Sequence, residues 1–480
     1  CDRKLGRKEP IGHKGITSSM TSSEWLNLLG SLLLPLSIGY ALVVLLCRRL
    51  SVDLLPSLAI SYGLGMGVLS QWMLLLGMAQ IPFNLATIGF PLTFVAIFLS
   101  FLALTKLKRN PLSADAKPSL WTTDAGSSAS LRQPYAIADF LMNAYILYNV
   151  IFVFWCSLNI PIESWDAVAT AAFKAKVFFF DRSIHRLNLP HAPYPLHIPF
   201  TEAWIAFNLR TWHESLVKII FPIAFLSYGI LQYFYLKSLT NHRWALGGLC
   251  LLLSSNFLVY HATIAYSDLT MMYYNCTTII LMLLWNRKKE DGLLVLGSLF
   301  AGFTTFVKLE GTGYLVIYTL LLLLILGQEK TLRAGSKFRK FLKFILPSYG
   351  ICLLYHVYKF SLDIAALHGR LNLVTTPDQW LRAPVIFREF AANLLGSGNW
   401  NLLWFILLVG FVANFSKTKY LPEIKLLSLI LAVFFGTYLI IPMLTSTLID
   451  HPTLLSRVLL HFFPIATWLI VLLYYPKKTF

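Results

Sequence analysis

The stretch WLNLLGSLLLPLSIGYALVVLLC, from Trp25 to Cys47, decides the class of fold. A helix of about 20 apolar residues crosses the hydrocarbon core of a membrane, which is about 30 Å thick. This stretch has that length and carries no charged side chain. Because 57% of the 480 residues are hydrophobic and only 13% are charged, the chain is predicted to be an all-α integral membrane protein rather than a water-soluble globule.

Similar apolar stretches recur along the chain as far as Tyr475. A transmembrane β-barrel would instead show short segments of alternating polarity. We therefore expect about 13 transmembrane helices. The predicted spans are 25–47, 54–79, 84–106, 136–158, 216–239, 243–261, 267–285, 291–308, 311–327, 341–358, 400–415, 424–447 and 454–475.

Short basic clusters beside these spans predict the orientation of the chain, because Lys and Arg concentrate in cytoplasmic loops. The clusters occupy residues 47–50, 106–110, 286–291, 330–343, 416–420 and 476–480. With these on the cytoplasmic side, the external face receives the segments 159–215, 262–266, 359–399 and 448–453.

The same pattern divides the chain into regions. Residues 1–19 are basic although the scheme puts them outside, so a native start at Met20 is one explanation and residues 1–19 would then not be native. The Ser-, Ala- and Pro-rich segment 107–135 predicts a flexible cytoplasmic linker. The expected regions are an N-terminal tail (1–24), N-terminal helices (25–106), the linker (107–135), a catalytic core (136–358), an external loop (359–399) and C-terminal helices (400–480).

Several other classes of protein are disfavoured. The six cysteines lie mostly in apolar stretches and show no metal-ligand spacing, so neither a zinc site nor a disulfide framework is expected. The formal charge of +18 comes from clusters that mark topology rather than from a nucleic-acid surface, so we expect no nucleic-acid partner. The sequence GLGMG at 63–67 favours a close helix contact over a phosphate-binding loop.

Polar residues of the first large external loop are the candidates for chemistry. PIESWDAVATAAFKAKVFFF (161–180) predicts a helix over 167–180, with Asp166 at its positive end. Its apolar residues recur at helical spacing, so the helix is expected to lie on the membrane surface with Lys174 and Lys176 in the polar layer. Either Asp166 accepts a proton or orients a nucleophile, or it only caps the helix while the lysines reach toward water.

Further candidates lie near the outer ends of the later spans. HAPYPLHIPFTEAWIAF (191–207) predicts a rigid loop that carries Tyr194, His197 and Glu202. In KLEG (308–311), Lys308 and Glu310 either pair with each other or Lys308 binds a phosphate. For Arg457, two interpretations remain: it either binds a phosphate with its planar guanidinium group or is a simple interfacial anchor. His461, one helical turn further on, would face the same side.

Four segments together resemble the bacterial GT-C glycosyltransferases, which are polytopic enzymes that use polyprenyl-phosphate-linked sugars. These segments are WDAVATAAFKAK, YPLHIPFTEAW, KLEG and SRVLLHFFP, spread in that order over roughly 136–475. The resemblance implies that Asp166 is the acidic residue that acts on the acceptor and that Asp268, in YSDLTMMYY, is the second acid. Glu163 and Asp166 stand where some branches have Asp-x-Asp, which leaves a divalent metal open.

The resemblance implies an inverting hexosyl or pentosyl transferase. The donor would be a polyprenyl-phosphate sugar held between helices, and the acceptor a lipid, a glycan or a protein on the external or periplasmic face of the bacterial inner membrane. Membrane lipids are a further expected partner, and no cofactor is certain. The alternative from another class is a transporter or flippase of a lipid-linked or amphiphilic substrate, which would place charges near the membrane midplane on broken helices.

Overall fold

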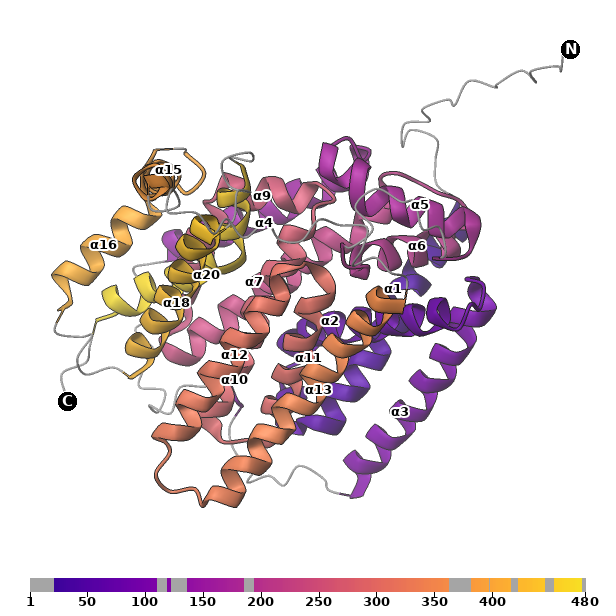
Figure 1. Cartoon of the computed structure of the whole chain (residues 1–480), viewed down its shortest axis with the longest axis horizontal. Helices are drawn as coiled ribbons and strands as arrows, with labels where there is room; N and C mark the ends of the chain where they lie inside the picture. Colours follow the sequence, from indigo (N-terminus) through magenta and orange to yellow (C-terminus); the bar gives the residue numbers. More distant parts are fainter. Residues whose placement is uncertain are drawn as a thin grey trace, which may run out of the picture.

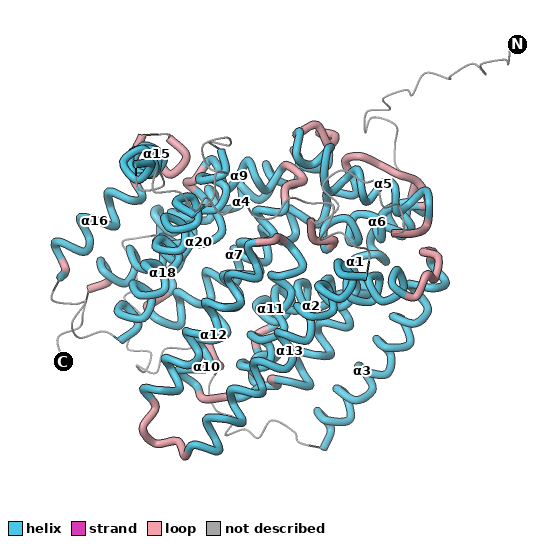
Figure 2. Tube along the Cα trace, viewed as in Figure 1, coloured by secondary structure: helices cyan, strands magenta, loops and turns pink. Residues whose placement is uncertain are grey.

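The computed structural model describes residues 21–109, 119–121, 136–184, 194–361, 381–396, 398–415, 422–444 and 453–476. Throughout these ranges the regular structure is helical, and Figure 2 shows helices joined by short loops. The helices are α1 (Ser22–Leu46), α2 (Leu54–Met78), α3 (Phe90–Arg109), α4 (Ala136–Asn159), α5 (Ala172–Asp181), α6 (His197–Leu209), α7 (Ile220–Leu239), α8 (His242–Leu253), α9 (Asn256–Thr263), α10 (Ser267–Lys288), α11 (Asp291–Val307), α12 (Glu310–Gln328), α13 (Ala334–Ser361), α15 (Ala383–Leu395), α16 (Leu403–Ala413), α18 (Pro422–Leu444) and α20 (Thr453–Tyr474). Short helical turns add Arg48–Val52, Leu85–Gly89, Ala167–Ala171 and Leu216–Ile219.

Nine helices within the described ranges are long and apolar enough to cross a membrane. The prediction of an all-α membrane protein is therefore confirmed, whereas the count of 13 spans stays a prediction. Four predicted spans are not among the nine: 243–261 is broken, 267–285 is too polar, and 291–308 and 400–415 correspond to shorter helices. The nine cover Ser22–Leu46, Leu54–Met78, Leu85–Arg109, Ile137–Asn159, Leu216–Leu239, Glu310–Gln328, Ala334–Ser361, Pro422–Ile440 and Leu454–Tyr474.

The predicted continuous span 243–261 is wrong because the chain bends by 71° between α8 and α9. Ser255 starts the second helix, where its hydroxyl accepts a hydrogen bond from the backbone amide of Leu258 at 3.2 Å. A serine at this position satisfies a helix-end amide that has no partner inside the helix. The apolar character of the stretch thus belongs to two helices that run in different directions.

Helix α10 lies at the centre of the molecule, which explains why it is the least apolar of the long helices. Every residue from Asp268 to Trp285 is buried, and α10 packs against α7, α11 and α20. Protein rather than lipid surrounds these side chains, so polar groups are tolerated if they find partners. By contrast, only 17% of the α3 span and 11% of the α4 span are buried, as expected of helices that face lipid.

The glycines of GLGMG allow α2 to approach its neighbours closely, as predicted. A Cβ atom on Gly63 would lie 2.5 Å from the hydroxyl oxygen of Tyr273, and one on Gly67 would lie 2.3 Å from the ring of Phe303. Real Cβ atoms do not approach other atoms this closely. The stretch is therefore a helix contact with α10 and α11.

The described parts of the segments predicted to be external lie at one end of the helical bundle. Figure 1 shows α5, α6, α9 and α15 at that end and the connection between α12 and α13 at the opposite end. This arrangement agrees with the relative placement expected from the basic clusters. Which end faces the cytoplasm stays a prediction.

One loop prediction is wrong. The segment 191–207 was expected to be a loop, but from His197 it forms the buried helix α6. The predicted linker 107–135 is described only at 107–109, in α3, and at 119–121, where Leu120 and Trp121 are buried in the core. An apolar pair inside a polar segment thus anchors the linker to the bundle.

Candidate functional site

A fully buried carboxylate, that of Asp268, lies at the centre of a group of charged side chains. Its Oδ1 atom is 2.8 Å from Lys308 Nζ and 3.1 Å from His461 Nε2, and its Oδ2 atom is 2.9 Å from Arg457 Nη2. Burying a charge is costly unless it is paired and hydrogen-bonded. Because both oxygens have charged or polar partners, Asp268 can remain ionised inside the protein.

Helix ends bring these residues together. Asp268 is in the first turn of α10, Lys308 directly follows α11, and Glu310 opens α12. Lys308 has an extended backbone, with φ −146° and ψ 158°, which separates the two helices. Only a glycine fits at 311, since a Cβ atom there would lie 2.1 Å from the carbonyl oxygen of Thr304.

Arg457 connects the buried acid to an accessible one. While its Nε and Nη2 atoms bind Asp268, its Nη1 atom donates to the carboxylate of Asp166. The Asp166 side chain is 37% exposed and that of Asp268 is 0% exposed. Tyr266 supports this bridge, because its ring lies 4.8 Å from the guanidinium and its hydroxyl accepts a hydrogen bond from the Asp166 amide at 3.4 Å.

This geometry bears on three of the alternatives left open by the sequence. Asp166 makes no capping hydrogen bond through its side chain, although the helical turn Ala167–Ala171 and α5 follow it. Arg457 is 19% exposed and bound to two carboxylates, which is more than an interfacial anchor needs. Lys308 pairs with Glu310 at 3.3 Å as well as with Asp268, so the pairing within KLEG is formed.

His461 extends the group into the core. Its Nδ1 atom lies 2.9 Å from the hydroxyl of Tyr314, and its backbone carbonyl accepts a hydrogen bond from Asn275 Nδ2 at 2.7 Å. Tyr318 in turn donates to Asn275 Oδ1. We name Asp166, Asp268, Lys308, Glu310, Arg457 and His461 the ionic cluster.

Four supporting residues were missed by the sequence analysis: Tyr266, Asn275, Tyr314 and Tyr318. The spacing of polar residues could have indicated Asn275, Tyr314 and Tyr318. Asn275 follows Asp268 by two helical turns, and Tyr318 follows Tyr314 by about one turn. Polar side chains that recur on one face of an apolar helix indicate a buried polar network. Tyr266 has no such signal, because it lies in the loop before α10.

Other predicted residues lie outside the ionic cluster. His197 is buried against Ser70, 2.9 Å from its hydroxyl, and burial lowers its pKa to about 3. Glu202 is fully buried in α6, and neither of its carboxylate oxygens has a hydrogen-bond partner within the described ranges. Burial raises the pKa of Glu202 well above its usual value. Both residues were expected on a loop, and the structure corrects this because they lie in the buried helix α6.

The two lysines of α5 differ from each other. Lys176 is 46% exposed and pairs with Glu214 at 2.8 Å, which agrees with a place in the polar layer. Lys174 does not reach that layer, because it is buried with its Nζ atom 3.4 Å from the carbonyl oxygen of Tyr194. Burial lowers the pKa of Lys174 to about 7.

The face expected to lie on the membrane is present on α5 and the turn before it. Trp165, Phe173 and Phe180 are 78%, 41% and 65% exposed. Glu163 is also exposed and makes no ion pair within the described ranges. Tyr194 lies within electrostatic range of Asp166, Lys308, Glu310 and Arg457, so it belongs to the surroundings of the ionic cluster.

A divalent metal does not fit the donor atoms of the ionic cluster. Both oxygens of Asp268 face cations or the ring nitrogen of His461, and a metal would have to displace them. In the part of the chain that the structure describes, no three His, Cys, Asp or Glu side chains are grouped as metal ligands. We therefore derive no step through a metal.

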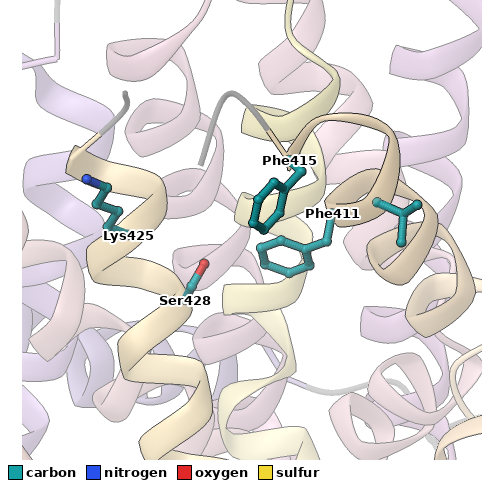
Figure 3. Close-up of a pocket in the computed structure, with 5 residues that line it drawn as sticks. Phe411, Phe415, Lys425 and Ser428 are labelled. Atoms are coloured by element: carbon teal, nitrogen blue, oxygen red, sulfur yellow. The ribbon is translucent and has the colours of Figure 1, made fainter. Parts of the chain in front are cut away.

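Figure 3 shows a pocket of a different kind, between the end of α16 and the start of α18. It is lined by Phe411, Val412, Phe415, Lys425 and Ser428 and is largely apolar. None of the residues of the ionic cluster contributes to it. With a single cation at its edge and no convergent polar groups, it offers no chemistry of its own.

Comparisons of the chain with models of protein families, with characterised proteins and with solved structures find no match.

Proposed function

We propose that the protein is a membrane glycosyltransferase that transfers a sugar from a polyprenyl phosphate to an acceptor hydroxyl at the outer face. The observation that carries the proposal is the pairing of an accessible acid, Asp166, with a buried acid, Asp268, through one arginine, Arg457. A carboxylate held in one orientation beside open space is what a general base requires. The resemblance of the four sequence segments supports the same assignment.

In the proposed reaction, the acceptor oxygen attacks the anomeric carbon of the sugar. The new bond joins that oxygen to the carbon, while the bond from the carbon to the phosphate oxygen breaks. The proton of the acceptor hydroxyl goes to Asp166, and the bonding electrons leave with the lipid phosphate. A single displacement of this kind inverts the configuration at the anomeric carbon.

Arg457 is a positioning residue in this scheme. Its guanidinium is shared between two carboxylates, which fixes the orientation of Asp166 by a planar fork. Lys308 and His461 keep Asp268 ionised and in place, so that Asp268 in turn holds Arg457. The ionic cluster thereby preorganises the base before substrate binds.

A transporter or flippase is the second candidate, and the bend between α8 and α9 favours it. Transport sites often lie where helices are broken, with charged residues at the break. Here the break carries Ser254 and Ser255, whereas the charged residues lie at the ends of α10, α11 and α12. We therefore rank transport below transfer.

Asp166→Asn tests the proposal, since it keeps the size of the side chain and removes the base. The purified variant should lose about 10²- to 10⁴-fold in transfer rate and should still bind donor. Transfer is measured with polyprenyl-phosphate hexoses and pentoses that carry a radiolabelled sugar, with membrane extracts as the source of acceptor. A flippase would instead move the labelled lipid across vesicles without releasing its sugar.

Glu163→Gln is the matched control, because Glu163 is an exposed acid of the same loop. The control should keep most of the transfer rate. If it loses activity while Asp166→Asn stays active, the wrong acid has been assigned. If both variants remain fully active, the assignment of this loop to glycosyl transfer fails.

A further inference from the structure

A cavity of about 510 Å³ lies beside the ionic cluster, and no residue of the cluster lines it. Its walls come from the end of α4, the following segment 160–164, α9 and the two residues after α9, with Lys218 from the turn before α7. Pockets for small organic ligands are roughly 300 to 1,000 Å³ in volume. The cavity is therefore large enough for the polar end of an amphiphile and the first part of its chain.

The lining of the cavity is formally neutral. Among its residues, Lys218 is the one cation and Glu163 the one acid. The Nζ atom of Lys218 donates to the carbonyl oxygen of Thr263 at 3.0 Å. The carboxylates of Glu163, Glu202 and Glu214 also act on this lysine. Because its charge is already compensated, the cavity calls for no anion, and a ligand without net charge fits it best.

Three lining side chains have hydrogen-bonding capacity that the described part of the chain leaves unused. They are the hydroxyls of Ser164 and Tyr260 and the amide of Asn256. A hydroxyl or an amide side chain can both donate and accept, as the hydroxyl group of a ligand can. The carboxylate of Glu163 adds a further acceptor to the same lining. These groups suit a ligand that carries one or more hydroxyls.

The cavity opens where the protein is expected to face lipid. Phe152, Ile160 and Tyr260 line it and are 40%, 42% and 52% exposed. Phe152 belongs to α4, the least buried of the candidate spans, and Ile160 directly follows that helix. An apolar wall that continues onto a lipid-facing helix suits the hydrocarbon chain of an amphiphile.

We propose that this cavity, which we name the α4–α9 cavity, binds a neutral membrane lipid that carries a free hydroxyl, and that this lipid is the sugar acceptor. The hydroxyl end bonds to Ser164, Asn256 and Tyr260, and the hydrocarbon chain leaves along the exposed side of α4. The role as acceptor rests on the proposed function, whereas the binding of the lipid does not.

The polar wall of the cavity leads to the accessible acid of the ionic cluster. Ser164 lines the cavity and precedes Asp166 by two residues. Tyr260 also lines it and lies within electrostatic range of Tyr266, whose hydroxyl accepts a hydrogen bond from the Asp166 amide at 3.4 Å. In the transfer step, the lipid hydroxyl gives its proton to Asp166. Its oxygen bonds to the anomeric carbon as the bond from that carbon to the donor phosphate breaks.

The first measurement is of binding and requires no catalysis. Dioleoylglycerol, its acetate ester and dioleoyl phosphatidylglycerol are titrated separately against the full-length protein in detergent, and bound lipid is counted by native mass spectrometry. The ester lacks the free hydroxyl, and phosphatidylglycerol is anionic. Dioleoylglycerol should bind about 10-fold more tightly than either, the effect expected of one lost hydrogen bond in a largely apolar cavity.

Two variants place the bound lipid in the α4–α9 cavity. Val259→Trp fills the cavity and should weaken binding of dioleoylglycerol by about 10-fold or more. Tyr260→Phe, a smaller change at a half-exposed side chain, should reduce the preference for dioleoylglycerol over its acetate ester. Ile151→Trp is the matched control, because Ile151 is 58% exposed on α4 and does not line the cavity. It should bind like the wild type.

The second measurement is of the acceptor. Donor with a radiolabelled sugar is supplied with dioleoylglycerol, with a soluble disaccharide or with a serine-containing peptide, and the label is followed into the lipid or the aqueous phase. Label should enter the lipid phase with dioleoylglycerol and stay out of the disaccharide and the peptide. Asp166→Asn should bind dioleoylglycerol like the wild type and fail to transfer, which separates the lipid site from the proposed function.

Two binding results would overturn the lipid site. One is equal affinity for dioleoylglycerol, its acetate ester and phosphatidylglycerol, and the other is wild-type behaviour of both Val259→Trp and Tyr260→Phe. Transfer to the disaccharide or the peptide in place of the bound lipid would overturn the role of that lipid as acceptor. If dioleoylglycerol binds as expected and no acceptor receives sugar, the proposed function fails while the lipid site stands.

Discussion

Two buried lysines at the same end of the bundle show opposite ways of placing a charge inside a membrane protein. Lys308 has carboxylates at 2.8 and 3.3 Å, whereas Lys218 has a backbone carbonyl at 3.0 Å. The first site is complete without any ligand, and the second lines a cavity. Carboxylates also act on Lys218, those of Glu163, Glu202 and Glu214, but none of them is within ion-pair distance in the described ranges. The difference teaches that a buried charge can be compensated by ion pairs at contact distance or by a neutral hydrogen bond with carboxylates further away.

The largest effect should come from removing the acid that holds the compensated site together. In the wild type, Lys308 and Arg457 share the carboxylate of Asp268 as their counter-charge. Asp268→Asn removes that charge, so the free energy of unfolding should fall by about 3 to 5 kcal/mol. Reversible denaturation in mixed micelles measures this loss.

Asp291→Asn is the matched control, because Asp291 also pairs with two cations but is 38% exposed. Its substitution should cost less than about 1 kcal/mol. Equal losses for the two variants would mean that burial does not distinguish the ionic cluster from a surface ion pair.

Replacing each of the two buried lysines by methionine tests the difference between them. Lys308→Met removes one of the cations that pair with Asp268. We therefore expect the free energy of unfolding to fall by about 2 to 3 kcal/mol. Lys218→Met removes a buried charge that has no carboxylate partner, so the ligand-free protein should stay within about 1 kcal/mol of the wild type or become more stable. Denaturation of the lipid-free proteins measures both. A larger loss of unfolding free energy in Lys218→Met than in Lys308→Met would contradict this difference between the two lysines.

The smallest effect concerns Lys174, whose pKa burial lowers to about 7 from 10.5. Between these two pH values the unfolded chain binds more protons at this residue than the folded protein does. Stability should therefore rise with pH above about 7, by at most about 1.4 kcal/mol per pH unit. Lys174→Met should remove this dependence, measured as the midpoint of thermal unfolding from pH 7 to pH 9.

Lys176→Met is the control for that measurement, because Lys176 lies two residues further on and is 46% exposed. It should keep the pH dependence of the wild type. A pH dependence that survives in Lys174→Met but not in Lys176→Met would assign the effect to the wrong lysine.

The resemblance and the topology scheme, taken together, anticipated most of the ionic cluster. They put Asp166, Asp268, Lys308 and Arg457 at the outer ends of helices, and the structure joins all four. His197 and Glu202 were predicted on a rigid, proline-rich loop that is part of the resemblance. The loop prediction is wrong because the residues around them are apolar enough to form the buried helix α6.

The burial of Lys218 could not be predicted from the sequence. Lys218 stands between a polar loop and an apolar span, where a lysine is ordinarily an interfacial anchor. Its burial comes from α4 and α6, which pack against the turn Leu216–Ile219. The bend between α8 and α9 was missed as well, because hydropathy measures how apolar a stretch is and carries no information on its direction.

The sequence by itself determined that the chain is helical and apolar enough to span a membrane, since the length and composition of each stretch are local properties. Only the tertiary structure decided which charges are paired and which line a cavity. Ion pairing depends on distances of 3 to 4 Å between residues as far apart in the chain as Asp166 and Arg457, and helix packing alone sets those distances.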